Sequence, residues 1–113
     1  MEITSKRMDH ATVISIEGSV DALTADQVTD YFSERMDEGN KQFIADLTQV
    51  DFMSSAGLRA ILATLKQSRQ KGGDLRLAAA QPGVEKILKM SGFTSILKTY
   101  PTVDEAVADF SVV

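Results

Sequence analysis

Residues 54–65 read SSAGLRAILATL, and they carry the strongest helix signal in the chain. Four apolar side chains recur there at the spacing i, i+3, i+4, i+7, which places them on one face of an α-helix. They are Leu58, Ile61, Leu62 and Leu65. At about 100° per residue, Arg59 and Lys66 fall on the opposite face. We therefore predict an amphipathic helix that buries its leucines and ends at Lys71-Gly72-Gly73.

The segments on either side of this helix are typical of buried strands. Residues 42–47 are apolar almost without interruption, as expected of a strand that is covered on both faces. A turn-like stretch over residues 48–51 follows them, and residues 75–79 repeat the apolar pattern after the glycine pair. This order of strand, helix and strand favours two parallel strands joined by a helix.

The N-terminal part continues the alternation of strands and helices. Short β-branched segments at residues 3–8 and 11–17 predict two paired first strands, and residues 18–21 break the strand pattern. Residues 24–27 have the Thr-x-x-Gln form of a capping box. We expect a helix from there to the glycine of residues 39–40, which tolerates a left-handed backbone.

The C-terminal part adds further helices. Pro82 stands where a first helical turn tolerates proline, residues 93–97 form either a loop or a short strand, and residues 102–105 are a second capping box. The whole order predicts an α/β fold with a mixed, mostly parallel sheet of four to five strands and about four α-helices. No linker divides the chain, so we expect residues 1–113 to form a single domain.

Composition excludes several classes of protein. The chain has 113 residues, 43% of them apolar, and no cysteine, which allows one core without disulfides or a cysteine-based zinc site. No apolar run approaches the roughly 20 residues of a membrane span, and the N-terminus lacks a signal peptide's pattern. We therefore expect a cytoplasmic protein without membrane insertion. The basic residues are dispersed and only 6% of residues are aromatic, which argues against nucleic acid as a partner.

The net charge of −4 is divided unequally along the chain. Residues 1–56 hold 4 basic and 11 acidic side chains, a net charge of −7, whereas residues 57–113 hold 8 basic and 5 acidic ones, a net charge of +3. The acidic half therefore ends directly after the serine pair at residues 54–55.

The residues of common catalytic and cofactor sites are missing or scattered. His10 is the only histidine, and we expect it to be exposed in a turn between the first two strands. There is no Gly-x-Ser-x-Gly elbow, and the glycines form neither a dinucleotide-binding motif nor a Walker motif. We expect no enzyme activity, no cofactor and no metal.

Two hydroxyl groups and a glycine stand at the start of the strongest helix. Serine is a preferred N-cap residue, so Ser54 alone explains part of this pattern. It does not explain the second hydroxyl at Ser55, nor Gly57 in the first turn, where glycine costs about 0.5–1 kcal/mol relative to alanine. A residue without a side chain at that place lets another backbone approach closely.

Four landmarks follow one another along nearly the whole chain. They are Gly18-Ser19-Val20-Asp21, Phe52-Met53-Ser54-Ser55-Ala56-Gly57-Leu58, Gly72-Gly73-Asp74-Leu75 and Met90-Ser91-Gly92-Phe93. In this order they resemble a STAS domain of the anti-sigma factor antagonist type, a family of bacterial regulators. The resemblance implies a protein-binding regulator of transcription and stress response rather than an enzyme.

The resemblance also implies a mechanism, which is known as partner switching. In that family the serine two positions before the glycine is phosphorylated by a kinase that is also the anti-sigma factor. That serine corresponds to Ser55 here, and Ser54 is the second candidate. When unphosphorylated, the protein would bind this serine kinase and release a sigma factor, and a serine phosphatase would reverse the phosphorylation. The implied partner-binding residues are Asp21, Ser54, Ser55, Ala56, Gly57, Leu58 and Arg59.

The chain departs from the family pattern at two positions. The family usually has Asp-Ser-Ser-Gly or Asp-Ser-Thr-Gly, whereas here Ser54 replaces the aspartate and Ala56 replaces the third-position hydroxyl. An alternative function is therefore a STAS accessory subunit of a transporter ATPase or of a stress-signalling assembly, in which Ser55 is never phosphorylated. The sequence also leaves a weak homodimer open.

Overall fold

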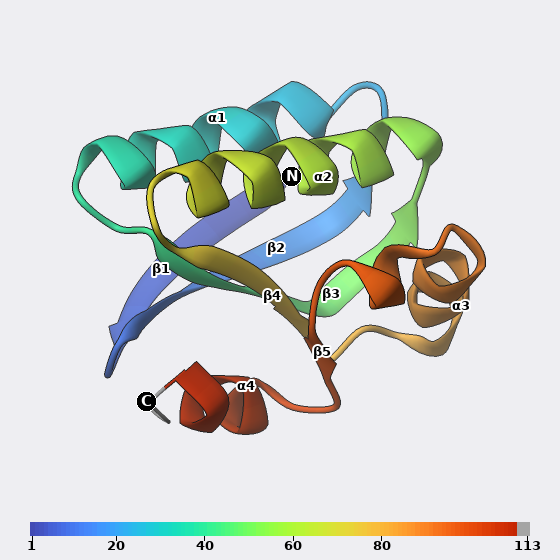
Figure 1. The fold of residues 1–113 in the computed structure, drawn as a ribbon. Coiled ribbons are helices and arrows are strands. Elements are labelled where there is room, and N and C mark those ends of the chain that lie inside the picture. Colours follow the sequence, from blue (N-terminus) through green and yellow to red (C-terminus); the bar gives the residue numbers. More distant parts are fainter. Residues whose placement is uncertain (111–113) are drawn as a thin grey trace.

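The computed structural model describes residues 1–110, which form one five-stranded sheet and four α-helices (Figure 1). The strands are β1 (Glu2–Met8), β2 (Ala11–Val20), β3 (Gln42–Met53), β4 (Asp74–Ala78) and β5 (Thr99–Tyr100). They stand side by side in sequence order, with β1 antiparallel to β2 and the other three pairs parallel. The predicted α/β fold with a mixed, mostly parallel sheet is confirmed.

The helices cover both faces of this sheet. They are α1 (Ala25–Asp37), α2 (Ser55–Gln70), α3 (Pro82–Met90) and α4 (Val103–Phe110). α1 and α2 lie side by side over one face, and α4 lies against the opposite face (Figure 1). The main core fills the space beneath α1, α2 and α3, where Phe32 and Phe43 meet edge to face with 5.3 Å between ring centroids. Under α4 a smaller core includes Val13, Ile44 and Val107.

Two strands are longer than the sequence pattern predicted. β2 continues through the expected break at residues 18–21 as far as Val20, and β3 continues through the expected turn at residues 48–51 as far as Met53. The two extensions pair with each other in parallel across two register shifts. The polar side chains in β3's extension are exposed, whereas Val50 is buried. A strand that buries only one face has a largely polar sequence, and for this reason the segment was predicted to be a turn.

The two expected capping boxes behave differently. The first is wrong, because Thr24 precedes α1 without a side-chain cap bond. The Thr24 hydroxyl instead donates to the carbonyl of Ser19 at 2.8 Å and accepts from the amide of Asp21 at 3.0 Å. At α4, the Thr102 hydroxyl accepts a hydrogen bond from the amide of Glu105 at 3.1 Å, which is the threonine half of the predicted capping box. A hydroxyl before a helix can thus bond backward to the preceding turn as well as forward.

Three smaller expectations can also be compared with the structure. Pro82 opens α3, and His10 is exposed in the turn between β1 and β2, both as predicted. Residues 93–97 contain a short 3-10 helix (Phe93–Ser95) rather than a strand, and the fifth strand begins two residues later at Thr99. That strand has only two residues, which is too short for a periodic pattern to show.

A cluster of charged and aromatic side chains holds α4 to the sheet. The carboxylate of Asp109 accepts a hydrogen bond from the Tyr100 hydroxyl and forms ion pairs with Arg76 at 3.4 Å and Lys98 at 3.6 Å. The Arg76 guanidinium lies 3.8 Å from the centroid of the Phe110 ring. Burial, together with the bond to Asp109, raises the pKa of Tyr100 to about 12, and the same hydrogen bond lowers the pKa of Asp109.

Candidate functional site

β3 and α2 meet at Ser54, where two hydrogen bonds fix the start of the helix. Ser54 has an extended backbone, with φ −92° and ψ 178°, and is the N-cap residue of α2. Its hydroxyl accepts a hydrogen bond from the amide of Gly57 at 3.4 Å. Its own amide donates to the carbonyl of Val20, at the end of β2, at 2.9 Å. The Ser54 side chain is therefore engaged with the helix, in agreement with the N-cap preference of serine.

Gly57 is buried where the first turn of α2 passes the end of β2. A Cβ atom at this position would lie 2.4 Å from the carbonyl oxygen of Val20 and 2.9 Å from the Met53 side chain. The sequence predicted that a backbone comes close to Gly57, and in the structure that backbone is the chain's own β2. The glycine thus lets α2 start directly against the end of the neighbouring strand.

Asp21 organises the turn that joins β2 to α1 beside this helix start. Its carboxylate accepts a hydrogen bond from the amide of Leu23 at 2.9 Å, and its backbone carbonyl accepts one from the amide of Ala25 at 2.8 Å. The Leu23 side chain is left 94% exposed. Asp21 therefore shapes the turn, and Leu23 is the side chain that the turn presents.

The structure brings the predicted partner-binding residues together, at the end of the molecule where β2 and β3 finish and α1 and α2 begin. They are Asp21, Ser54, Ser55, Ala56, Gly57, Leu58 and Arg59. Ser55 and Arg59 are the exposed members of this set. Leu58 is partly buried against the main core. Gly57 is buried against Val20 and Met53. The accessible chemistry of the site therefore lies with a hydroxyl and a guanidinium.

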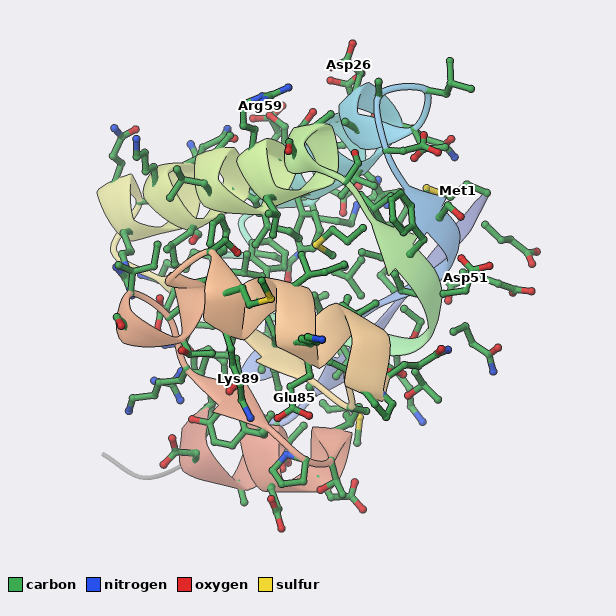
Figure 2. The ribbon with its side chains drawn as sticks, turned by 90° about the vertical axis from the view of Figure 1, so that its right-hand side faces the viewer. Met1, Asp26, Asp51, Arg59, Glu85 and Lys89 are labelled. Atoms are coloured by element: carbon green, nitrogen blue, oxygen red, sulfur yellow. The ribbon has the colours of Figure 1, made fainter. Side chains whose placement is uncertain are left out.

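A groove of about 550 Å³ lies between α1 and α2 at this end. Small side chains and two charged ones line it, namely Ala22, Ala25, Asp26, Thr29, Ala56, Arg59, Ala60 and Ala63. Figure 2 shows Asp26 on α1 and Arg59 on α2, both projecting away from the sheet. Among the ion pairs of residues 1–110, none includes Arg59. The groove is thus lined mostly by small side chains, and the Arg59 guanidinium in it has no ion-pair partner within residues 1–110.

Two exposed apolar side chains at this end were not predicted. Leu23 is 94% exposed, and Phe52, close to the end of β3, is 49% exposed. Phe52 pairs with Ser19 on β2, so both apolar residues belong to the segments that meet at the start of α2. The exposure of Leu23 could have been inferred from the sequence, because Leu23 lies in a turn and outside the apolar stripe of the following helix. Phe52 belongs to the motif of residues 52–58, but its exposure depends on how β2 pairs with β3, which the sequence does not show.

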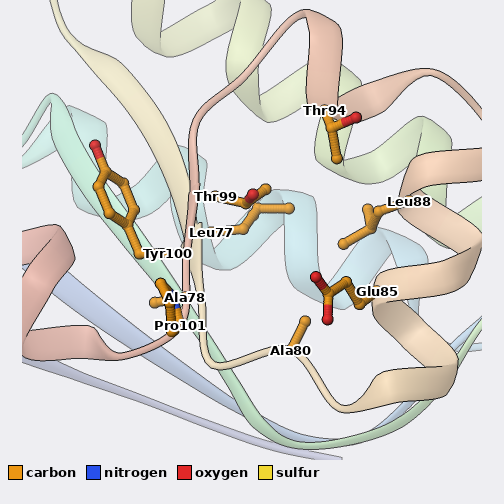
Figure 3. A pocket seen from close by; sticks show the side chains of 9 residues that line it. All are labelled: Leu77, Ala78, Ala80, Glu85, Leu88, Thr94, Thr99, Tyr100 and Pro101. Atoms are coloured by element: carbon orange, nitrogen blue, oxygen red, sulfur yellow. The ribbon is translucent and has the colours of Figure 1, made fainter.

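The rest of the described structure offers fewer groups for chemistry. A second pocket of about 270 Å³ lies between α3 and strands β4 and β5, and none of the predicted site residues lines it (Figure 3). Its one charged lining residue, Glu85, forms an ion pair with Lys89 at 3.2 Å. Over residues 1–110 we find no cluster of three metal-ligating side chains. None of the helices in that range has the length and hydropathy of a membrane span.

Comparisons with known proteins agree on one family. The profile described as STAS domain matches residues 2–106 of the chain. BtrV of Bordetella bronchiseptica, which is named as a candidate anti-sigma factor antagonist, is 33% identical over 110 residues. This similarity covers 97% of the present chain and 95% of BtrV.

Solved structures show the same fold. An anti-sigma factor antagonist from Mycobacterium paratuberculosis matches with a TM-score of 0.86 at 23% identity, over 96% of this chain and 92% of that one. The anti-sigma factor antagonist SpoIIAA in its unphosphorylated form matches with a TM-score of 0.82 at 19% identity, over 99% and 98% of the two chains. SpoIIAA of Bacillus in its phosphorylated form matches with a TM-score of 0.73 at 20% identity, over 96% and 99%.

Proposed function

This chain belongs to the STAS domain family of anti-sigma factor antagonists, and on that ground we propose that it binds an anti-sigma factor and thereby releases a sigma factor. In this proposal the anti-sigma factor is a cytoplasmic serine kinase that binds the unphosphorylated chain. The kinase phosphorylates Ser55, which ends the interaction, and a serine phosphatase restores it. The observation that carries the proposal is the exposed Ser55 hydroxyl at the start of α2.

The two serines differ in what their hydroxyls do. The Ser54 hydroxyl caps α2 through the amide of Gly57, and the residue is partly buried. Ser55 is exposed, and no hydrogen bond within residues 1–110 involves its hydroxyl. A kinase must reach the hydroxyl that it phosphorylates and align it with a phosphate donor. This difference supports Ser55 over Ser54 as the phosphorylation site.

The surroundings of Ser55 suit a protein partner. Leu23 and Phe52 offer exposed apolar surface on the neighbouring segments, and Ala56, next to Ser55 in the chain, lines the groove between α1 and α2. Buried apolar anchors surrounded by polar groups are the usual source of affinity in protein interfaces. We therefore place the docking surface over the turn before α1, the end of β3 and the first turns of α2.

Phosphorylation would act on this interface more than on the fold. It adds a charge of about −1.5 to −2 at neutral pH. The positive end of the α2 dipole would stabilise that charge by about 0.3–1 kcal/mol, so the free domain stays folded. In the complex the phosphate would lose water, and every 1.4 kcal/mol lost there weakens binding about tenfold. A change from 99% bound to 1% bound needs about 5.5 kcal/mol.

The test uses the kinase that the chain captures from extracts of its own cells. We expect the wild-type protein to retain this kinase without ATP and to release it with ATP, gaining one phosphate. Ser55→Ala should retain it under both conditions, and Ser54→Ala should behave like the wild type. Ser55→Asp should bind at least about tenfold more weakly, because it carries part of the phosphate's charge.

Two results would contradict the proposal. A phosphate that still appears on Ser55→Ala would reject Ser55 as the site, and equal affinity of Ser55→Asp and wild type would reject the electrostatic mechanism. An unphosphorylated accessory subunit of a transporter ATPase or stress-signalling assembly predicts instead a partner that stays bound in ATP and no phosphate on the chain. The same experiment therefore separates the two functions.

A further inference from the structure

Ser55 and Arg59 are four residues apart on α2, and both are exposed. Side chains at this spacing lie on the same side of a helix, with about 5–6 Å between their Cβ atoms. An acidic group that precedes a basic one at this spacing has the favourable orientation for an ion pair. A phosphate on Ser55 would stand in that orientation to Arg59.

Arg59 is also the basic side chain nearest to Ser55 along the chain. Between residues 8 and 65 the only other basic residues are Arg35 and Lys41. Arg35 lies in the last turn of α1 and pairs with Glu38 at 3.0 Å, and Lys41 precedes β3 at the end of the strand opposite to α2. Neither can serve a phosphate at the start of α2.

One acidic side chain competes for Arg59 across the groove. Asp26 lines the same groove from α1, yet the two side chains form no ion pair in the described structure (Figure 2). A phosphate carries more charge than a carboxylate and offers three acceptor oxygens to the donor fork of an arginine. It also stands on the same helix as Arg59, so no movement of α1 is needed. The phosphate is therefore the stronger partner.

We propose that phosphoserine at position 55 forms an ion pair with Arg59 along α2, and that this pair withdraws Arg59 from an acidic side chain of the bound kinase. The inference rests on the proposed function, because that function supplies the phosphate and the kinase. Phosphorylation then weakens the complex in two ways. It adds negative charge at the docking surface, and it neutralises the cation that lines the groove.

The first half of the proposal can be tested without any kinase. Phosphoserine is incorporated at position 55 during synthesis of the full chain, and the phosphorus NMR signal is followed as the pH is changed. We expect the midpoint of the phosphate titration to lie a few tenths of a pH unit lower in the wild type than in Arg59→Gln, because a neighbouring cation favours the dianion. Arg59→Lys should restore most of the difference. Lys66→Gln removes an exposed cation about three turns from Ser55 and should leave the midpoint unchanged.

Equal midpoints in the wild type and Arg59→Gln would overturn the ion pair. The second half is tested on the unphosphorylated protein, where Arg59→Gln should bind the captured kinase several-fold more weakly than Lys66→Gln does. Equal binding of these two variants would overturn the role of Arg59 in docking. Both results would leave ATP-dependent release by the wild type intact, whereas a failure of release alone would contradict the proposed function and not the ion pair.

Discussion

The start of α2 depends on residues that look interchangeable in the sequence. Ser54 and Ser55 are neighbours of the same type, but one hydroxyl closes the first turn of the helix and the other is free at the surface. Gly57 has a different role at the start of α2: because it has no side chain, the carbonyl of Val20 can pack against the first turn of the helix. The position of the free hydroxyl is thus set by contacts that involve other residues.

Replacement of Gly57 by alanine is expected to destabilise the fold. The new Cβ atom would meet the Val20 carbonyl at 2.4 Å, so α2 must shift away from β2. We expect a loss of about 1–3 kcal/mol in the free energy of unfolding, as for other overpacked sites. The cost of this clash should exceed the stabilisation of about 1 kcal/mol that alanine brings through its higher helix propensity, so the net effect is destabilising. Urea unfolding measures the difference.

Gly83→Ala is the matched control for this variant. Gly83 lies in α3, and nothing comes within 4 Å of a Cβ atom at that position. We expect this variant to be as stable as the wild type or more stable. If Gly57→Ala were also as stable as the wild type, the close approach of β2 would not be what requires the glycine.

At the scale of elements, α4 depends on one polar cluster as well as on its small core. Asp109 connects α4 to Tyr100 on β5 and to Arg76 on β4. The Tyr100 hydroxyl can donate to the carboxylate only while it is protonated. The attachment of α4 should therefore weaken at alkaline pH.

The raised pKa of Tyr100 predicts the sign of this effect. The value is about 12 in the folded chain against 10.0 for an unperturbed tyrosine, so the unfolded chain loses this proton first. The stabilisation is fully present below about pH 10 and is lost as the pH rises toward about 12. Urea unfolding at about pH 8 and about pH 11 should show a larger loss of stability in the wild type than in Tyr100→Phe. Tyr31→Phe should lose as much as the wild type, because it keeps Tyr100, and an equal loss in Tyr100→Phe would contradict the assignment.

The elements also show what a sequence pattern can predict. α2 was predicted well because its apolar spacing, its N-cap serine and its terminal glycines all indicate the same helix. The ends of β2 and β3 were missed because their pairing is a contact between segments distant in sequence. Likewise, the resemblance to STAS domains pointed to Ser55, whereas the contact between Gly57 and Val20 and the exposure of Leu23 needed the fold.

At the scale of the whole molecule, the strand order places the two charge halves in space. The strands stand in sequence order, so the acidic half, residues 1–56, forms the β1–β2–β3 side of the sheet together with α1. The other half supplies β4, β5, α3 and α4, together with α2 except for its first two residues. Ser55 lies at the boundary between the halves. A partner that docks there meets an acidic helix, α1, on one side and the basic Arg59 on the other.

This arrangement predicts electrostatic steering of the partner by α1. Its exposed carboxylates, among them Asp26 and Asp30, would attract a cationic region of the kinase before contact. The association rate constant, measured by stopped flow, should fall between about 50 and 200 mM salt, because salt screens such attraction. Changing Asp26 and Asp30 to asparagine should lower the rate at low salt.

The control for steering lies on the opposite face of the sheet. Asp104 and Glu105 are exposed in the first turn of α4, just as Asp26 is exposed in the first turn of α1. Neutralising that pair changes the net charge by the same amount as neutralising Asp26 and Asp30, but far from the docking surface. We expect it to leave the association rate near the wild-type value. Equal effects of the two double variants would mean that only net charge matters, and that the docking surface does not lie beside α1.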